Sequence, residues 1–337
     1  MIGDLGPPST LSVFQAGRAG LPPPFPPPKP PPVPRARGAA MVIPAIRGVK
    51  ISENQSPRPQ DRVYYTLNYF QGVNNQVNQR LQAPIGYTQI FRNIFGFEKT
   101  FLDGQGSVGL RMPIDTVTAA SSVPKSFGNY GGTSTAVDNL SIYAKYILLE
   151  NRDNGNLLSG GLALGVPTGP GKFAGLNSFA SITNTTSFQP FLGYILNSGR
   201  WYLHGFSAID VPASSQDVTL FYNDAGVGYF LRRPDPNSNV NRLISTIAPT
   251  FEVHITDPLN HRNPYSRQDV VGMTDIVDFT FGLNVGIGRQ TLLTFAVVTP
   301  VTSPKPFDFE AVAFVNFFFG APRQSRAPVA PPVVGGF

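Results

Sequence analysis

The chain has 337 residues, no cysteine and three histidines, so it offers neither a disulfide framework nor a thiolate metal site. Charged residues make up 14% of the sequence, below the roughly 25% usual for soluble domains, whereas aromatic residues reach 12%. The net charge of +6 lies in the tails: residues 1–60 carry +5, the stretch after Gly320 carries +2, and residues 61–320 carry −1. This distribution argues against a nucleic-acid surface on the body of the chain, and the sequence predicts no cofactor and no bound metal.

The first 61 residues are rich in proline, glycine and arginine and lack hydrophobic periodicity, which predicts a disordered arm. Within it, LPPPFPPPKPPPVP (21–34) contains ten prolines in fourteen residues. Such a run can form neither a helix nor an internal strand, and it favours an extended polyproline II rod about 43 Å long. The opening MIGDLGPPST has neither the basic nor the apolar region of a signal peptide, so any leader is predicted to lie upstream.

Between the tails, apolar and polar residues alternate with the period of two that is typical of strands. In VDFTFGLNVGIG (277–288), every odd position is Val, Phe, Leu or Ile, and the even positions are polar or glycine. Most segments of this kind have the roughly nine to eleven residues that a tilted strand needs to cross a bilayer, and none reaches the length of a membrane-spanning helix. Twelve are predicted, at 62–71, 85–102, 106–116, 138–150, 156–166, 187–197, 200–211, 217–231, 242–256, 275–287, 290–299 and 307–319.

The connections between these segments alternate in length. The odd-numbered ones are loops, of which 117–137 and 167–186 are the longest, and the even-numbered ones are mostly tight turns such as DGQG and NSGR. This alternation is typical of outer-membrane barrels, which have short periplasmic turns and long outer loops. A soluble β-domain is the alternative, but it would need more charge on its exterior than these strands carry.

We therefore predict an all-β protein, a twelve-stranded antiparallel up-and-down barrel in a bacterial outer membrane. The barrel spans residues 62–320, between the disordered arm at 1–61 and a short disordered tail at 321–337. An even number of strands places both ends of the barrel on one side, which predicts that both termini are periplasmic.

Two hairpins resemble those of a known family, the outer-membrane barrel proteins linked to the meta-pathway of phenol degradation. DNLSIYAKYILLENRDNGNLLSGGLALGVPTGPG (138–171) is similar in its Asp-Asn-Leu-Ser entry, its Lys145-Tyr146 pair and the Val-Pro-Thr-Gly end of its second strand. GFEKTFLDGQGSVGLRMPI (96–114) resembles the preceding hairpin. The resemblance implies a barrel that passes small, often apolar solutes, and it implies no catalytic residue.

If the apolar faces meet lipid, the opposite faces line the lumen and carry charges of both signs. Either these charges pair across a narrow interior as a network that fills it, or they form a constriction that selects solutes by charge. The predicted lumen-lining residues are Arg92, Glu98, Arg111, Lys145, Asp210, Glu252, His254, Asp278 and Glu310.

The predicted function is a channel for small solutes, apolar or aromatic ones among them, through a narrow lumen of mixed charge. The alternative is a structural barrel without an open pore, anchored to the cell wall by its proline-rich arm. Both functions predict outer-membrane lipid as a partner, and neither involves enzymatic activity. For residues 21–60, the expected partner is peptidoglycan or a periplasmic protein, unless the arm is a passive linker.

Overall fold

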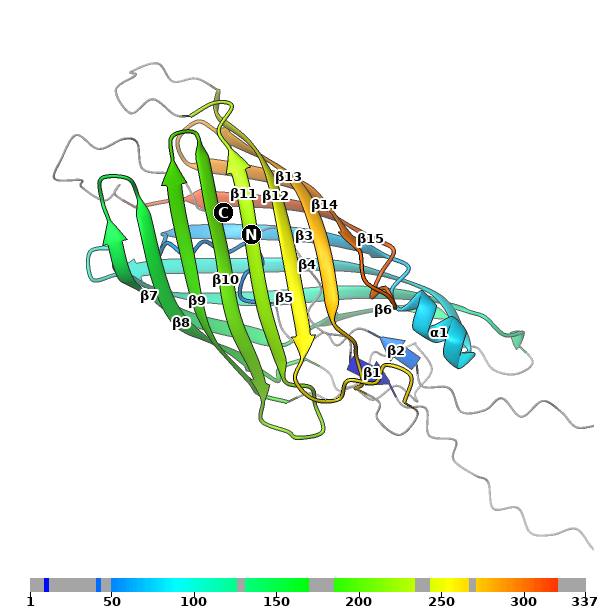
Figure 1. The fold of residues 1–337 in the computed structure, drawn as a ribbon. Coiled ribbons are helices and arrows are strands. Elements are labelled where there is room, and N and C mark those ends of the chain that lie inside the picture. Colours follow the sequence, from blue (N-terminus) through cyan, green and yellow to red (C-terminus); the bar gives the residue numbers. More distant parts are fainter. Residues whose placement is uncertain are drawn as a thin grey trace, which may run out of the picture.

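The computed structural model describes residues 9–11, 41–43, 50–125, 131–169, 185–233, 243–266 and 271–320 (Figure 1). The proline run at 21–34 and the tail at 321–337 lie outside these residues, so the predictions made for them stay predictions. Most of the long 167–186 connection also lies outside them.

Twelve antiparallel strands form a closed barrel, as the sequence predicts. Each strand pairs with its neighbours along the chain, and the last pairs with the first through Phe309↔Gln71 to Phe318↔Arg62. The strands are β3 (Arg62–Gln71), β4 (Ile85–Phe101), β5 (Gly106–Ser121), β7 (Leu140–Asn151), β8 (Asn156–Val166), β9 (Ser187–Ser198), β10 (Trp201–Pro212), β11 (Leu220–Tyr229), β12 (Ile244–Pro258), β13 (Ile276–Ile287), β14 (Thr291–Pro300) and β15 (Phe309–Phe318).

The region 117–137, predicted as a loop, contains regular structure. β5 continues to Ser121, and a further strand, β6 (Gly132–Val137), pairs with it beyond the point where β7 does. The threonines of the two strands explain the extension, because Thr116 hydrogen-bonds Thr135 across the pair at 2.8 Å while the alternate Val117 is buried.

Three further elements lie outside the barrel wall. α1 (Asn75–Leu81) lies in the connection between β3 and β4, which was predicted as a loop. β1 (Ser9–Leu11) and β2 (Met41–Ile43) form a separate antiparallel pair. None of the helices in the described part of the chain has the length and apolar character needed to cross a membrane.

The two ends of the barrel differ. At the turn end, four connections are short, at 102–105, 152–155, 199–200 and 288–290, and the one between β11 and β12, at 230–243, is long. Gly199 and Gly288 have positive φ values of 57° and 61°, which glycine adopts without strain. At the loop end lie α1 and the longer connections, and Figure 1 shows β1 and β2 there beside α1.

The outer face of the barrel is apolar. Large side chains such as Phe95, Phe281 and Phe295 are 48%, 58% and 53% exposed, and the residue before each of them is buried. An apolar surface of this extent is suited to lipid and not to water.

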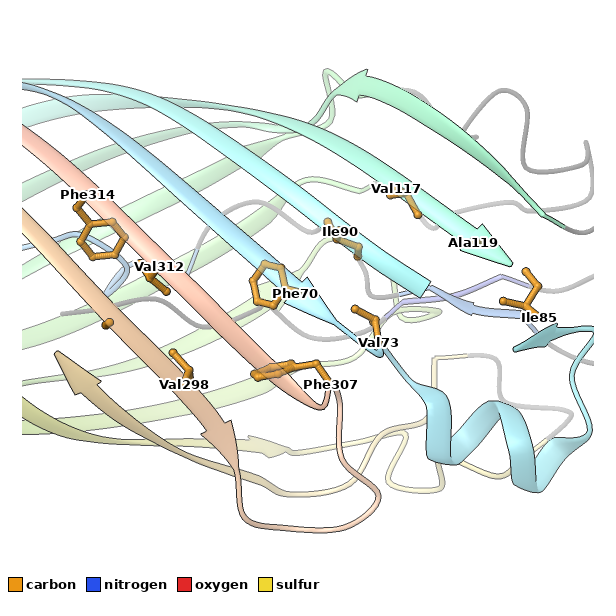
Figure 2. Packing of buried hydrophobic residues seen from close by; sticks show 11 residues of the cluster. Phe70, Val73, Ile85, Ile90, Val117, Ala119, Val298, Phe307, Val312 and Phe314 are labelled. Carbon is orange, nitrogen blue, oxygen red and sulfur yellow. The ribbon is translucent and has the colours of Figure 1, made fainter. Parts of the chain in front are cut away.

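Inside the loop end, one wall of the barrel is also apolar. A cluster of buried side chains comes from the adjacent strands β14, β15, β3, β4 and β5 and from the loops next to them (Figure 2). Phe70 and Phe307 meet edge to face with ring centroids 5.5 Å apart. The remaining members include Ile90, Val117, Val298, Val312 and Phe314.

Candidate channel interior

The strands turn their polar side chains inward. All nine residues predicted to line the lumen are buried, with Lys145 the most exposed at 3%. Because successive residues of a strand point to opposite faces, the same alternation that exposes the phenylalanines outside buries these charges inside. The outer face of the barrel is therefore apolar, and its interior carries the charged side chains together with buried apolar clusters such as the wall at the loop end.

A segment of the chain itself lies within this interior. Residues 50–57, which we call the plug segment, are all buried, and they precede β3 directly. The arm was predicted to be disordered through residue 61, and the structure differs at β1 and β2, described above, and at residues 50–61. The reason is that polar side chains inside the barrel bind these residues, and composition alone does not reveal such partners.

The plug segment runs alongside β3 in the opposite direction. Three side-chain hydrogen bonds fix this course, namely Gln55 to Tyr64, Asn54 to Thr66 and Asn68 to Glu53, each at 2.9 Å. Since β3 begins at the turn end, the plug segment enters from the loop-end side and its residue numbers rise toward the turn end.

Lys50 holds the loop-end side of the plug segment by charge. Its Nζ lies 2.8 Å from Oδ1 of Asp224 on β11, and neither side chain is exposed. Nδ1 of His254 lies 3.1 Å from the same carboxylate oxygen, and the Arg111 guanidinium donates to the Lys50 carbonyl at 2.9 Å. Glu252 then lies 3.3 Å from His254, which extends the network along β12.

Ile51 adds an apolar contact on the other side of the same turn. It is 1% exposed and belongs to a buried cluster that contains Phe191, Phe206 and Tyr222 from β9, β10 and β11. Its backbone N–H donates to Oε1 of Gln189 at 2.6 Å. The plug segment is thus bound by an ion pair and an apolar contact at adjacent residues.

A second charged cluster surrounds Glu98 near the turn end. Its carboxylate lies 3.0 Å from Nε of Arg62 and 2.8 Å from Nζ of Lys145, and it accepts a hydrogen bond from Ser107 at 2.7 Å. Lys145 also donates to the Ser56 carbonyl at 2.7 Å, so this cluster binds the end of the plug segment that leads into β3.

The structure brings some of the predicted residues together and separates others. Glu98 meets Lys145, and Glu252 meets His254. Arg92 pairs instead with Asp115 at 3.1 Å, and Glu310 accepts a hydrogen bond from Asn68. Asp210 and Asp278 are buried on β10 and β13, and each takes part in further interactions.

Several interior residues were missed by the sequence analysis. Asp115 and Asp224 lie on inward faces that strand alternation gives, because Asp224 follows Leu220 and Tyr222 at a spacing of two and all three are buried. Arg62 stands at the first residue of its strand, where a face is hardest to assign. Lys50 and Glu53 lie in the arm, and no periodic signal points to them.

These contacts fill much of the interior with paired charges. Removing a charged side chain from water is costly unless a partner and hydrogen bonds compensate, and the pairs around Glu98 and Asp224 provide both. The arrangement can hold an internal segment in place. If that segment leaves, the polar side chains that now bind it become free to bind water.

The sequence matches no family model, and no curated protein matches it. Among solved structures, the barrel is similar to the COG4313 outer-membrane channel from Pseudomonas putida F1, with 11% identity, a TM-score of 0.54, and coverage of 79% of this chain and 98% of that chain. The transport unit of the autotransporter AIDA-I from Escherichia coli has 11% identity and a TM-score of 0.48 over 82% of this chain and 94% of that one. The β-domain of the Bordetella autotransporter BrkA has 12% identity and a TM-score of 0.47 over 77% and 100%.

At these identities the similarity establishes the fold. The chain has the fold of an outer-membrane β-barrel, as the sequence predicts. The finer resemblance to the phenol-degradation family rests on the two hairpins at 96–114 and 138–171 and stays a prediction.

Proposed function

We propose that the protein is an outer-membrane channel for small solutes, closed in this state by its own residues 50–57. The observation that carries the proposal is a buried, polar plug segment inside a barrel whose outer face is apolar. It is supported by the similarity in fold to an outer-membrane channel.

The plug segment can leave without dismantling the barrel. The twelve strands pair with one another in a closed ring, and the plug segment is not a member of any pairing. It is joined to β3 through residues 58–61, and the contacts described above are hydrogen bonds of its side chains and backbone, the Lys50–Asp224 ion pair and the apolar contact of Ile51. Because none of these contacts is a strand pairing, release of the plug segment would leave the ring of twelve strands intact.

The interior favours small solutes with an apolar part. The cluster around Phe70 and Phe307 gives an apolar wall at the loop end (Figure 2). The clusters of Glu98 and Asp224 add charged groups to the interior. Such a combination of surfaces suits small aromatic acids, which combine a ring with a charge. No catalytic role is assigned to these residues.

The position of the turn end indicates which end of the barrel faces the periplasm. Arg62 and Phe318 are paired, so the barrel begins and ends there, and short turns belong on the periplasmic side of outer-membrane barrels. We propose this orientation for the barrel. The alternative function, a structural barrel anchored to the cell wall, shares this orientation and differs in having no solute flux.

Replacing Ile51 by aspartate is expected to start solute flux. The substitution puts a carboxylate among Phe191, Phe206 and Tyr222, which disfavours the plugged state by several kcal/mol, or about a hundredfold in population. The assay is swelling of proteoliposomes in arabinose and in benzoate.

The matched control is Leu259→Asp, which makes the same kind of change at a side chain that is 55% exposed in the connection after β12. It should behave like the unaltered chain, with little flux. A folded Ile51→Asp barrel that passes neither solute would favour the structural alternative and overturn the channel proposal.

A further inference from the structure

The course of the plug segment determines where the preceding chain emerges. Residues 50–57 run from the loop-end side toward the turn end, and residue 61 reaches the turn end, where Asp61 accepts hydrogen bonds from Thr100. The chain before Lys50 therefore starts on the loop-end side. To return to the turn end it would have to cross an interior that the plug segment and its partners already occupy.

The position of β1 and β2 agrees with this course. β2 contacts α1, and α1 belongs to the connection between β3 and β4 at the loop end (Figure 1). β1 pairs with β2 through Ser9↔Ile43 to Leu11↔Met41. Leu11 and Met41, which flank the stretch 12–40, thus lie together on the side of α1.

We propose that the protein threads its own barrel and displays residues 12–40 on the loop-end face, the outer face of the outer membrane. This stretch contains the ten-proline run, with four basic side chains and no acidic one. The sequence places the same stretch in the periplasm, because β3 begins at the turn end and a disordered arm would start there. The inference rests on the course of the chain and on the orientation proposed above, and it is independent of whether the barrel conducts.

Single-cysteine labelling tests the inference, because the chain has no cysteine of its own. Ala19→Cys reports on the displayed stretch. Ser215→Cys, exposed in the connection between β10 and β11, marks the loop end, and Asp153→Cys, exposed in the turn between β7 and β8, marks the turn end. Intact cells are treated with a charged maleimide that does not cross the membrane.

Ala19→Cys and Ser215→Cys are both expected to be labelled in intact cells. Their labelling should exceed that of Asp153→Cys by roughly tenfold or more, because the bilayer excludes the charged reagent. After the outer membrane is permeabilised, all three should label. If Ala19→Cys is labelled only after permeabilisation, as Asp153→Cys is, or only after the barrel is denatured, residues 12–40 are not displayed on the outer face. Absence of solute flux would leave this labelling pattern unchanged, so the two proposals fail separately.

Discussion

Replacing Lys50 by glutamate is expected to convert a closed barrel into one that conducts ions. The new carboxylate would face Asp224, whose side chain is fully buried, at the place where Lys50 Nζ now lies 2.8 Å away. Loss of a buried pair with a like charge in its place costs about 3–5 kcal/mol, which favours release of the plug segment by a factor of roughly 10²–10³ or more. Single-channel recording of the full-length chain in a planar bilayer should show discrete steps that the unaltered chain rarely makes.

Lys125→Glu serves as the control, because it makes the same change of charge at an exposed residue. It should keep the quiet recording of the unaltered chain. Frequent openings in both variants would mean that net charge and not the Lys50–Asp224 contact governs conduction, and a silent Lys50→Glu barrel would mean that this contact does not hold the plug segment.

Replacing Glu98 by glutamine is expected to give the largest loss of stability. Its carboxylate is shared by Arg62 and Lys145, which are 2% and 3% exposed, so the change leaves two buried cations without the charge they share. We expect the free energy of unfolding to fall by about 3–5 kcal/mol. The measurement is the urea concentration at which the heat-modifiable band of the folded barrel disappears from a gel.

Asp275→Asn provides the comparison. Asp275 also pairs with an arginine, Arg262, but the two side chains are 49% and 56% exposed. An exposed pair contributes less than about 1 kcal/mol to stability, so the urea concentration at which the folded band disappears should change little. Equal shifts for the two variants would show that burial does not set the strength of these ion pairs.

The barrel could be predicted from sequence because its two faces differ so sharply. The strand alternation of 277–288 is visible residue by residue, and tight turns such as NSGR mark most of the even-numbered connections. β8 and β3 therefore begin and end where predicted. β6 was missed because its threonines and alanine give little contrast between faces, although Thr133 pairs with Thr118 across the strands. α1 was missed because seven residues are too few for a helical period to stand out.

Interior residues could be predicted only where they belong to the strands of the barrel wall. Glu98 and Lys145 could be placed inside by counting along their strands, whereas their meeting depends on the register between β4, β5 and β7. The plug segment could not be found in this way. Lys50 gains order from Asp224, which is far away in the chain, and Glu53 from Asn68 on the neighbouring β3. Nothing local in a stretch next to so many prolines indicates that order.

The plug segment lies inside the barrel, and the reactivity of one cysteine placed in it tests this position. Ser52 is 2% exposed, and Ser52→Cys changes a single atom. In the full-length protein, a small charged thiol reagent should modify this cysteine at least about a hundredfold more slowly than Ser215→Cys, because it reacts only while the plug segment is out. Adding Lys50→Glu should remove most of that protection. Equal rates at residues 52 and 215 in the otherwise unaltered chain would contradict the account, since the interior would then be open or the plug segment elsewhere.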